Sequence, residues 1–323
     1  MNNPPFLSNC SAGTIREAAA ALKAGHLVAF PTETVYGLGA DARNPDAVKR
    51  IYEVKGRPTD HPLIVHISSI SQLENWAVDI PDYAISLARA FWPGPMTLIL
   101  RRSEIAGHFI TGGQETVGLR VPSDPIALAL IQEFEKISDS AIAAPSANRF
   151  GQVSPTSSSD VYQEIGKYLA DSDIVLDGGN SSIGIESTII DCTGEGPRIL
   201  RPGFITFEDV EAHTGLQCQS ASDSIVLKFS GSFEKHYAPK CKVALDEEIL
   251  DGAAFLALNK IETPQNMIRL ASPSSVEEFA RILYSTLRKA DSSGFEALVV
   301  SMPVGDGIAL AIRERLNKAA KGR

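Results

Sequence analysis

Short apolar runs recur along the first two hundred residues of this 323-residue chain, separated by segments rich in helix-forming residues. Runs of this length predict buried strands, and the segments between them predict helices. The predicted strands cover residues 26–30, 62–67, 96–100, 116–121, 141–145, 174–179, 187–192 and 198–203, and the predicted helices cover 12–24, 45–55, 71–77, 82–91, 125–135 and 158–169. Because strands and helices do not alternate strictly, we expect an α/β fold with a twisted, mixed sheet rather than a regular doubly wound one.

The second half of the chain changes character at residues 214–240, which are Ser-rich and carry few helix signals. This composition predicts a linker between domains. Beyond it, strands at 255–259 and 297–301 and helices at 274–289 and 306–320 predict a small alternating α/β unit. We therefore expect a catalytic domain over 1–213, a linker over 214–240 and a C-terminal domain over 241–323.

Composition excludes several classes of protein. No apolar run approaches the eighteen or so residues of a membrane span, and the N-terminus shows no secretion signal. The four cysteines form no CxxC or CxxH pair, so we expect reduced thiols, a cytoplasmic location and no metal site of zinc type. The net charge of −9 disfavours a sequence-independent nucleic-acid coat, but it leaves room for a local basic pocket that holds a small anion.

The triplet Lys55-Gly-Arg57 is the first candidate for such a pocket. It lies where a predicted helix ends and the chain turns towards a strand. A polyphosphate would bind both cations, Arg57 as a planar fork and Lys55 as a point charge. A solvated basic helix end that complements the helix dipole fits the sequence equally well.

A second polar cluster, Ser146-Ala-Asn148, follows the predicted strand 141–145. It lies at the carboxyl end of a strand, where ligands gather in open α/β sheets. A hydroxyl and an amide suit phosphate oxygens. The alternative is a simple turn, because this segment is rich in turn-forming residues.

Two arginines and two histidines complete the candidates from residue chemistry alone. Arg120 and Arg201 each end an apolar strand, so each needs an anionic partner, either a ligand or an internal carboxylate. His61 precedes the strand 62–67 and His66 lies near its end, and no third ligand at a suggestive spacing indicates a metal. No Walker A loop, GxSxG or GxGxxG motif occurs.

With these residues assembled, the chain resembles the threonylcarbamoyl-AMP synthases, the YrdC-like family, in the long two-domain form. The motifs that carry the resemblance run in order over about 190 residues: PTETVYGLG (31–39), KGRP (55–58), PLIVHI (62–67), WPGPMTLIL (92–100), VGLRVP (117–122), APSAN (144–148), ESTIID (186–191) and ILRPG (199–203). HYAP (236–239) is typical of the long form. The resemblance implies a YrdC-like mixed-sheet domain, a linker and a small Rossmann-like α/β domain.

The resemblance also implies a reaction. The amine of L-threonine is carboxylated by bicarbonate, and the carbamate attacks the α-phosphate of ATP to give threonylcarbamoyl-AMP and pyrophosphate. Other proteins then transfer the threonylcarbamoyl group to adenosine 37 of tRNAs that read ANN codons. Clustered cations and hydroxyls suit such anionic substrates, and adenylation needs no covalent enzyme intermediate.

By analogy with the family, the resemblance implies a role for each matching residue. Threonine is expected to contact Thr34, His66, Arg120, Ala144 and Ser187. ATP is expected to contact Lys55, Arg57, His61, Thr116, Ser146, Asn148, Ser154, Arg201 and Tyr237, of which Lys55, Arg57, Ser146 and Asn148 are expected to be catalytic. Mg²⁺ should accompany the phosphates without a dedicated protein site, and Tyr237 is expected to close over the nucleotide from the linker.

The chain departs from the family pattern at two places. Position 61 is often asparagine in relatives, and the segment before HYAP, SGSFEK, lacks an extra lysine that relatives carry.

Two other functions share parts of this pattern. An RNA-binding module of the same fold is disfavoured by the acidic composition. A carbamoyl-adenylate-forming domain of the hydrogenase-maturation type would bring acylphosphatase and CxxC zinc modules, which this sequence lacks.

Overall fold

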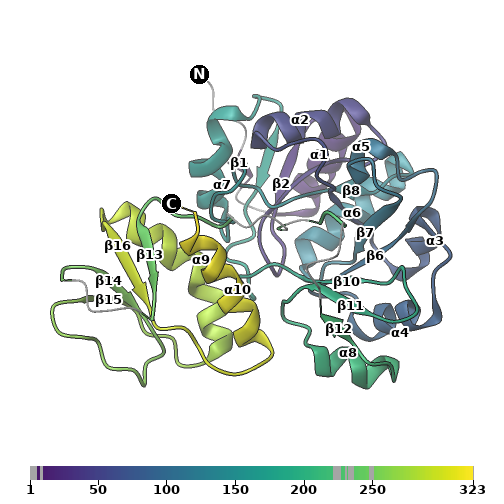
Figure 1. Cartoon of the computed structure of the whole chain (residues 1–323). Coiled ribbons are helices and arrows are strands. Elements are labelled where there is room, and N and C mark those ends of the chain that lie inside the picture. The colour runs from purple at the N-terminus through teal and green to yellow at the C-terminus, as the bar shows by residue number, and fades with distance from the viewer. Residues whose placement is uncertain are drawn as a thin grey trace.

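The computed structural model describes residues 6–7, 10–220, 227–229, 231, 236–246 and 251–322, and these form two α/β units (Figure 1). A mixed sheet organises the first unit, with strand order β1-β9-β2-β3-β8-β4-β7-β6-β10-β11-β12 and β5 paired to β6. Its strands are β1 Phe6–Leu7, β2 Val28–Phe30, β3 Gly37–Asp41, β4 Ile64–His66, β5 Ala77–Val78, β6 Met96–Arg102, β7 Thr116–Arg120, β8 Ile142–Ala143, β9 Ile174–Leu176, β10 Thr188–Asp191, β11 Arg198–Arg201 and β12 Gln219–Ser220. The expected mixed α/β sheet is confirmed.

The helices of the first unit cover the sheet, and α2 and α4 end at their predicted residues. They are α1 Ala12–Lys23, α2 Pro45–Lys55, η1 Ile70–Gln72, α3 Leu73–Trp76, α4 Asp82–Phe91, α5 His108–Thr111, α6 Pro125–Ser138, α7 Ser158–Ile165, η2 Gly166–Tyr168 and α8 Phe207–Thr214. The side chain of Asn44 caps α2 by accepting from the N–H groups of Asp46 and Ala47, and Gly56 ends the helix in the left-handed region. Asn44 and Gly56 therefore fix the point from which Arg57 projects.

Six strands and α-helices of this unit were not predicted from the sequence: β1, β3, β5, β12, α5 and α8. Strand β3 was missed because its two glycines weaken the strand pattern. Gly39 is required there, since a Cβ would lie 2.7 Å from the side chain of Ile142 and 2.9 Å from that of Phe30. Helix α5 and strand β12 are too short to show a period. Helix α8 has an apolar face reduced to one buried residue, Val210.

The structure also modifies the expected linker over 214–240. Strand β12 pairs with β11, so the large sheet extends to Ser220. Of the remaining linker, residues 227–229, 231 and 236–240 are described, and the others lie outside the described residues. Within it, Lys228 exchanges two hydrogen bonds with the side chain of Gln114, at 2.8 and 2.9 Å, and its Nζ lies 2.5 Å from a carboxylate oxygen of Asp60. The linker is therefore anchored on the first unit.

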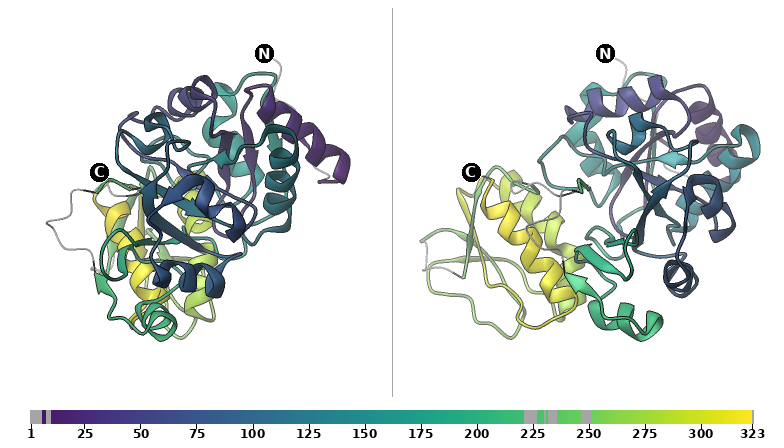
Figure 2. Two further views of the ribbon diagram at one scale, coloured as in Figure 1. Left: turned by 90° about the vertical axis from the view of Figure 1, so that its right-hand side faces the viewer. Right: turned by 45° about the vertical axis from the view of Figure 1, so that its right-hand side comes forward.

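The C-terminal unit is a parallel sheet of order β13-β16-β14-β15 with two helices on one face. Its elements are β13 Lys242–Leu245, β14 Ala254–Leu256, β15 Ile268–Ala271, α9 Val276–Ser292, β16 Ala297–Val300 and α10 Ile308–Ala320. The expected Rossmann-like unit is confirmed, with strands β13 and β15 in addition to those predicted. Helices α9 and α10 lie between this sheet and the first unit (Figures 1 and 2).

The two units share one apolar core at their junction. Val35, Val153 and Ile185 of the first unit pack in the same buried cluster as Phe279, Leu283, Leu287, Ile312 and Leu316 of α9 and α10. Burial of this apolar surface stabilises the arrangement of the two units. Among the described residues, no helix is both long enough and apolar enough to cross a membrane.

Candidate active site

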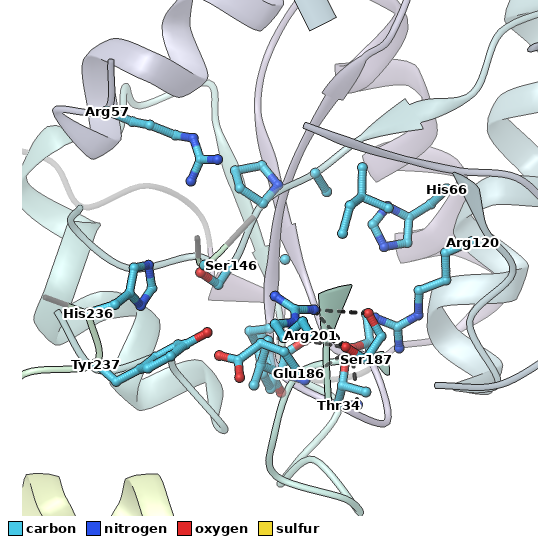
Figure 3. A pocket seen from close by; sticks show the side chains of 18 residues that line it. Thr34, Arg57, His66, Arg120, Ser146, Glu186, Ser187, Arg201, His236 and Tyr237 are labelled. Carbon is cyan, nitrogen blue, oxygen red and sulfur yellow. Dashed lines mark hydrogen bonds between the residues drawn. The ribbon is translucent and has the colours of Figure 1, made fainter. Parts of the chain in front are cut away.

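A cavity opens where several strands of the large sheet end (Figure 3). Neighbouring strands carry its side chains to the same place: β4 and β7 are parallel, and their register sets His66 beside Arg120. Ala144 and Ser146 follow β8, Ser187 precedes β10, and Arg201 ends β11. The strand-end positions predicted from sequence therefore converge on one cavity.

Two sides of this cavity differ in the residues they present (Figure 3). Thr34, His66, Arg120 and Ser187 lie on one side, and Arg57, Ser146, His236 and Tyr237 lie on the other. Arg201 reaches in between them. The residues of the first side were all assigned to threonine by the resemblance, and those of the second side, apart from His236, were assigned to ATP. The ligand contacts themselves stay predictions.

Arg120 is held by a carboxylate that the sequence reasoning left unnamed. One of its terminal nitrogens donates to Oε1 of Glu33 at 2.7 Å, and both side chains are 5% exposed. The other oxygen of Glu33 accepts from the N–H of Ser123 at 3.1 Å. The Nε of Arg120 has no hydrogen-bond partner among the described residues. Glu33 therefore orients the guanidinium while leaving donors for a further anion.

Arg201 is hydrogen-bonded to Ser187, a residue of the threonine side. Its Nε and one terminal nitrogen donate to the backbone oxygen of Ser187 at 3.1 and 2.8 Å, and the same nitrogen lies 3.1 Å from the Ser187 Oγ. That hydroxyl also lies 2.8 Å from Thr97 Oγ1. Because Arg201 is 3% exposed, its position is set by these bonds rather than by solvent.

Lys55 does not line the cavity. Its Nζ donates to the backbone oxygens of Ser146 and Asn148, each at 2.5 Å, and it is 2% exposed. Asn148 is equally buried, and its amide nitrogen donates to the backbone oxygens of Arg149 and Gln152 at 2.8 Å. These two residues hold the loop that presents Ser146. Their assignment as direct ATP ligands stays a prediction.

Burial changes the acid–base properties of the groups around the cavity. Burial, followed by the nearby Arg120, lowers the pKa of His66 to about 3, and burial lowers the pKa of His236 to about 3. Both imidazoles are therefore neutral at pH 7 and act as hydrogen-bonding groups. Burial also lowers the pKa of Arg57 to about 10, which leaves it charged. The positive charge of the cavity comes from its arginines.

A second pocket adjoins the cavity and shares Ile64 with it. Its lining is mostly apolar and includes Ile99, Ile189 and Phe229, and its polar residues are Thr97, Gln114, Thr116 and Lys228. The structure therefore places Thr116 in the second pocket.

Two more predicted ATP residues lie outside the lining of both pockets. His61 is 6% exposed and packs near the ring of Phe150, 6.2 Å between centroids. Ser154 donates to a carboxylate oxygen of Glu186 at 2.6 Å.

The linker completes the cavity. Gly231, His236 and Tyr237 belong to its lining. Gly231 has φ +87°, and a Cβ there would lie 2.7 Å from the hydroxyl of Tyr237. That hydroxyl has no partner among the described residues. Tyr237 therefore aims a donor into the cavity, which is the placement expected of a residue that closes over a ligand.

The sequence reasoning missed Glu33, Glu186 and His236 as site residues, although all three stand inside the motifs it quoted. Glu186 lines the cavity and accepts from Ser154. The available signal was the placement of each carboxylate next to a predicted ligand residue. That Glu33 pairs with Arg120 and Glu186 with Arg315, both far along the chain, depends on the fold alone. Among the described residues, no group of three or more His, Cys, Asp or Glu could hold a metal ion.

Comparisons with known proteins agree with this site. A family model described as "Telomere recombination" (Sua5, YciO and YrdC proteins) matches residues 20–203, and one described as "Threonylcarbamoyl-AMP synthase, C-terminal domain" matches residues 205–321. Threonylcarbamoyl-AMP synthases of Pyrococcus abyssi and Bacillus subtilis are each 40% identical, over 95% and 96% of this chain and 94% and 93% of theirs. A structure of Pyrococcus abyssi Sua5 complexed with L-threonine has TM-score 0.88 and 38% identity, covering 99% of this chain and 98% of that one.

Proposed function

This chain belongs to the threonylcarbamoyl-AMP synthase family, and we propose that it is an L-threonylcarbamoyladenylate synthase, a nucleotidyltransferase. It joins L-threonine, bicarbonate and ATP into threonylcarbamoyl-AMP and releases pyrophosphate and water. The observation that carries the proposal is the single cavity with three arginines and two chemically distinct sides, in a chain whose net charge is −9. Such a cavity suits substrates that each carry an anionic group: a triphosphate, the carboxylate of threonine and bicarbonate.

Threonine binds on the side formed by Thr34, His66, Arg120 and Ser187. Arg120 holds the substrate carboxylate, because Glu33 occupies one of its nitrogens and leaves the others for a second anion. The hydroxyl of Ser187 and the neutral imidazole of His66 form hydrogen bonds with the amine and the hydroxyl of threonine. With a pKa of about 3, His66 is a hydrogen-bonding partner that orients the threonine and does not take up its proton.

ATP binds from the opposite side and extends into the second pocket. Arg57 and Arg201 hold the phosphates together with the hydroxyl of Ser146, and they stabilise the charge that develops at the α-phosphate. The adenine occupies the apolar second pocket, with Thr116 in hydrogen-bonding reach of the nucleoside. Tyr237 closes over the phosphates from the linker.

The chemistry needs no covalent enzyme intermediate. The threonine nitrogen takes up the carbon of bicarbonate, with loss of water, and forms a carbamate. A carbamate oxygen then attacks the α-phosphorus of ATP, and the bond to the bridging oxygen breaks to release pyrophosphate. Holding two substrates against each other in one cavity converts this into an effectively unimolecular step.

The reaction also involves Mg²⁺ and proteins that use the product. Mg²⁺ enters with the ATP phosphates, since phosphate oxygens and water supply most of its preferred ligands. Other proteins take up the product and modify adenosine 37 of tRNAs that read ANN codons, so this chain need not bind tRNA. We place the reaction in the cytoplasm because the four cysteines are free thiols, which a reducing compartment preserves.

The test is whether pyrophosphate release depends on every substrate. The purified protein is incubated with ATP, Mg²⁺, L-threonine and bicarbonate, and each substrate is left out in turn. Pyrophosphate should appear only when all are present, together with a product that carries carbon from labelled bicarbonate. Release without threonine would contradict the proposal. Tight, steeply salt-dependent RNA binding without any release would favour an RNA-binding module instead.

A further inference from the structure

The C-terminal unit reaches the cavity through one buried carboxylate, that of Glu186. Its Oε1 accepts from Ser154 at 2.6 Å within the first unit. Its Oε2 accepts from the hydroxyl of Tyr284 on α9 at 2.8 Å and from Nε of Arg315 on α10 at 3.2 Å. Tyr284 and Arg315 are completely buried. The carboxylate that lines the cavity is thus held jointly by both units.

The charge of Glu186 is fixed by the same partners. Burial by itself would raise the pKa of this carboxyl, but Arg315, Arg201 and the hydrogen bonds from Ser154 and Tyr284 outweigh it and bring the pKa down to about 2. Glu186 is therefore ionised throughout the physiological range and does not exchange protons with a substrate. Its oxygens are occupied by protein donors, so its function is to hold structure.

The backbone around Glu186 lies tightly against α9. Gly184 has φ +82°, and a Cβ there would lie 2.5 Å from the Cα of Arg281. On its other side this segment is bonded to the threonine side of the cavity, since the N–H of Ile183 donates to the backbone oxygen of Glu33 at 2.7 Å. The path from α9 to the residue that orients Arg120 is therefore short and continuous.

The same two side chains also seat the linker. The ring of Tyr237 stacks on that of Tyr284 with 5.6 Å between centroids and 25° between planes, and the guanidinium of Arg315 lies 5.9 Å from its centroid. One turn further along α10, Nζ of Lys318 donates to the backbone oxygen of Gly231. Both linker positions, Gly231 and Tyr237, belong to the cavity lining.

From these contacts we propose that the C-terminal unit acts as a positioning platform for the synthase reaction. Tyr284 and Arg315 hold the Glu186–Ser187 segment on the threonine side, and Lys318 with the rings of Tyr237 and Tyr284 holds the linker on the nucleotide side. The platform sets the distance between the two bound substrates. This inference rests on the proposed function for its kinetic part and on the fold alone for its structural part.

The test uses full-length variants that remove one contact each. Tyr284→Phe deletes the hydrogen bond to Glu186 but keeps the ring under Tyr237, and it should raise the threonine KM about tenfold with little change in the ATP KM. Lys318→Met deletes the bond to Gly231 and should raise the ATP KM about fivefold with little change in the threonine KM. The matched control is Tyr83→Phe on α4, which loses a bond of similar length to Gly194 O, 2.9 Å, and should leave both constants within twofold.

Amide hydrogen exchange without substrates provides the structural readout. Exchange at residues 185–188 should be faster in Tyr284→Phe than in the wild type, and unchanged there in Tyr83→Phe. Unchanged exchange in Tyr284→Phe overturns the proposal, and so does faster exchange with an unaltered threonine KM in an active enzyme. If the wild type releases no pyrophosphate, the proposed function fails while the exchange comparison still tests the platform.

Discussion

Lys55 and Arg57 are two residues apart in sequence, and the structure predicts that their replacement has opposite consequences. The Lys55 ammonium donates to two backbone oxygens of the loop that presents Ser146. Hydrogen bonds from a charged group contribute on the order of 1.5–3 kcal/mol each, and the cost of burying the ammonium offsets part of that sum. Lys55→Met, which nearly conserves volume, should therefore lower the free energy of unfolding by about 2–4 kcal/mol.

Arg57 instead projects into the cavity, and one of its terminal nitrogens donates to Pro62 O at 3.1 Å. Arg57→Met should cost less than about 1 kcal/mol of stability, because a single polar contact is lost beside an open cavity. Turnover should fall about 100- to 1000-fold, the effect of removing one donor that stabilises transition-state charge.

The two variants are compared by urea unfolding and by pyrophosphate release. Both tryptophans, Trp76 and Trp92, lie in the first unit, so their fluorescence reports on the unit that contains these residues. The reasoning fails if Lys55→Met unfolds at the wild-type urea concentration. It fails equally if Arg57→Met keeps turnover within threefold of the wild type.

Three further outcomes follow from the site. Arg120→Lys should raise the threonine KM about 10- to 100-fold, because a point charge cannot bind both Glu33 and a carboxylate as a fork does; an unchanged KM in threonine titrations would count against the clamp. Thr116→Val should raise the ATP KM about threefold to tenfold with the threonine KM unchanged, measured by pyrophosphate release. The pKa values of His66 and His236 are lowered by burial from 6.5 to about 3, so between about pH 6.5 and 3 the unfolded chain binds protons that the folded chain does not. Stability should therefore fall as the pH falls through this window, and His236→Gln should flatten that slope in thermal unfolding; a slope equal to that of the wild type would contradict it.

Local signals were sufficient for the elements that have strong caps and long apolar faces. Helix α2 begins at its Asn44-Pro45 cap and ends at Gly56, and helix α4 matches its predicted bounds. Strand β3 escaped prediction because its glycines serve packing against Phe30 and Ile142, which are distant in sequence or on another strand. Helix α8 escaped because it buries little of its own surface.

The sequence by itself determined the mixed α/β class, the two-unit organisation and the family motifs, since periodicity, caps and ordered motifs are local properties of the chain. It also named half of the residues that line the cavity. Tertiary structure alone decided what each of them does there: it turned Lys55 towards a loop and Arg57 into the cavity, paired Arg120 with Glu33, and set Glu186 between Tyr284 and Arg315. The physical reason is that a buried charge takes its partner from whatever the fold brings within a few ångströms, and those partners lie about 90 to 130 residues away in the chain.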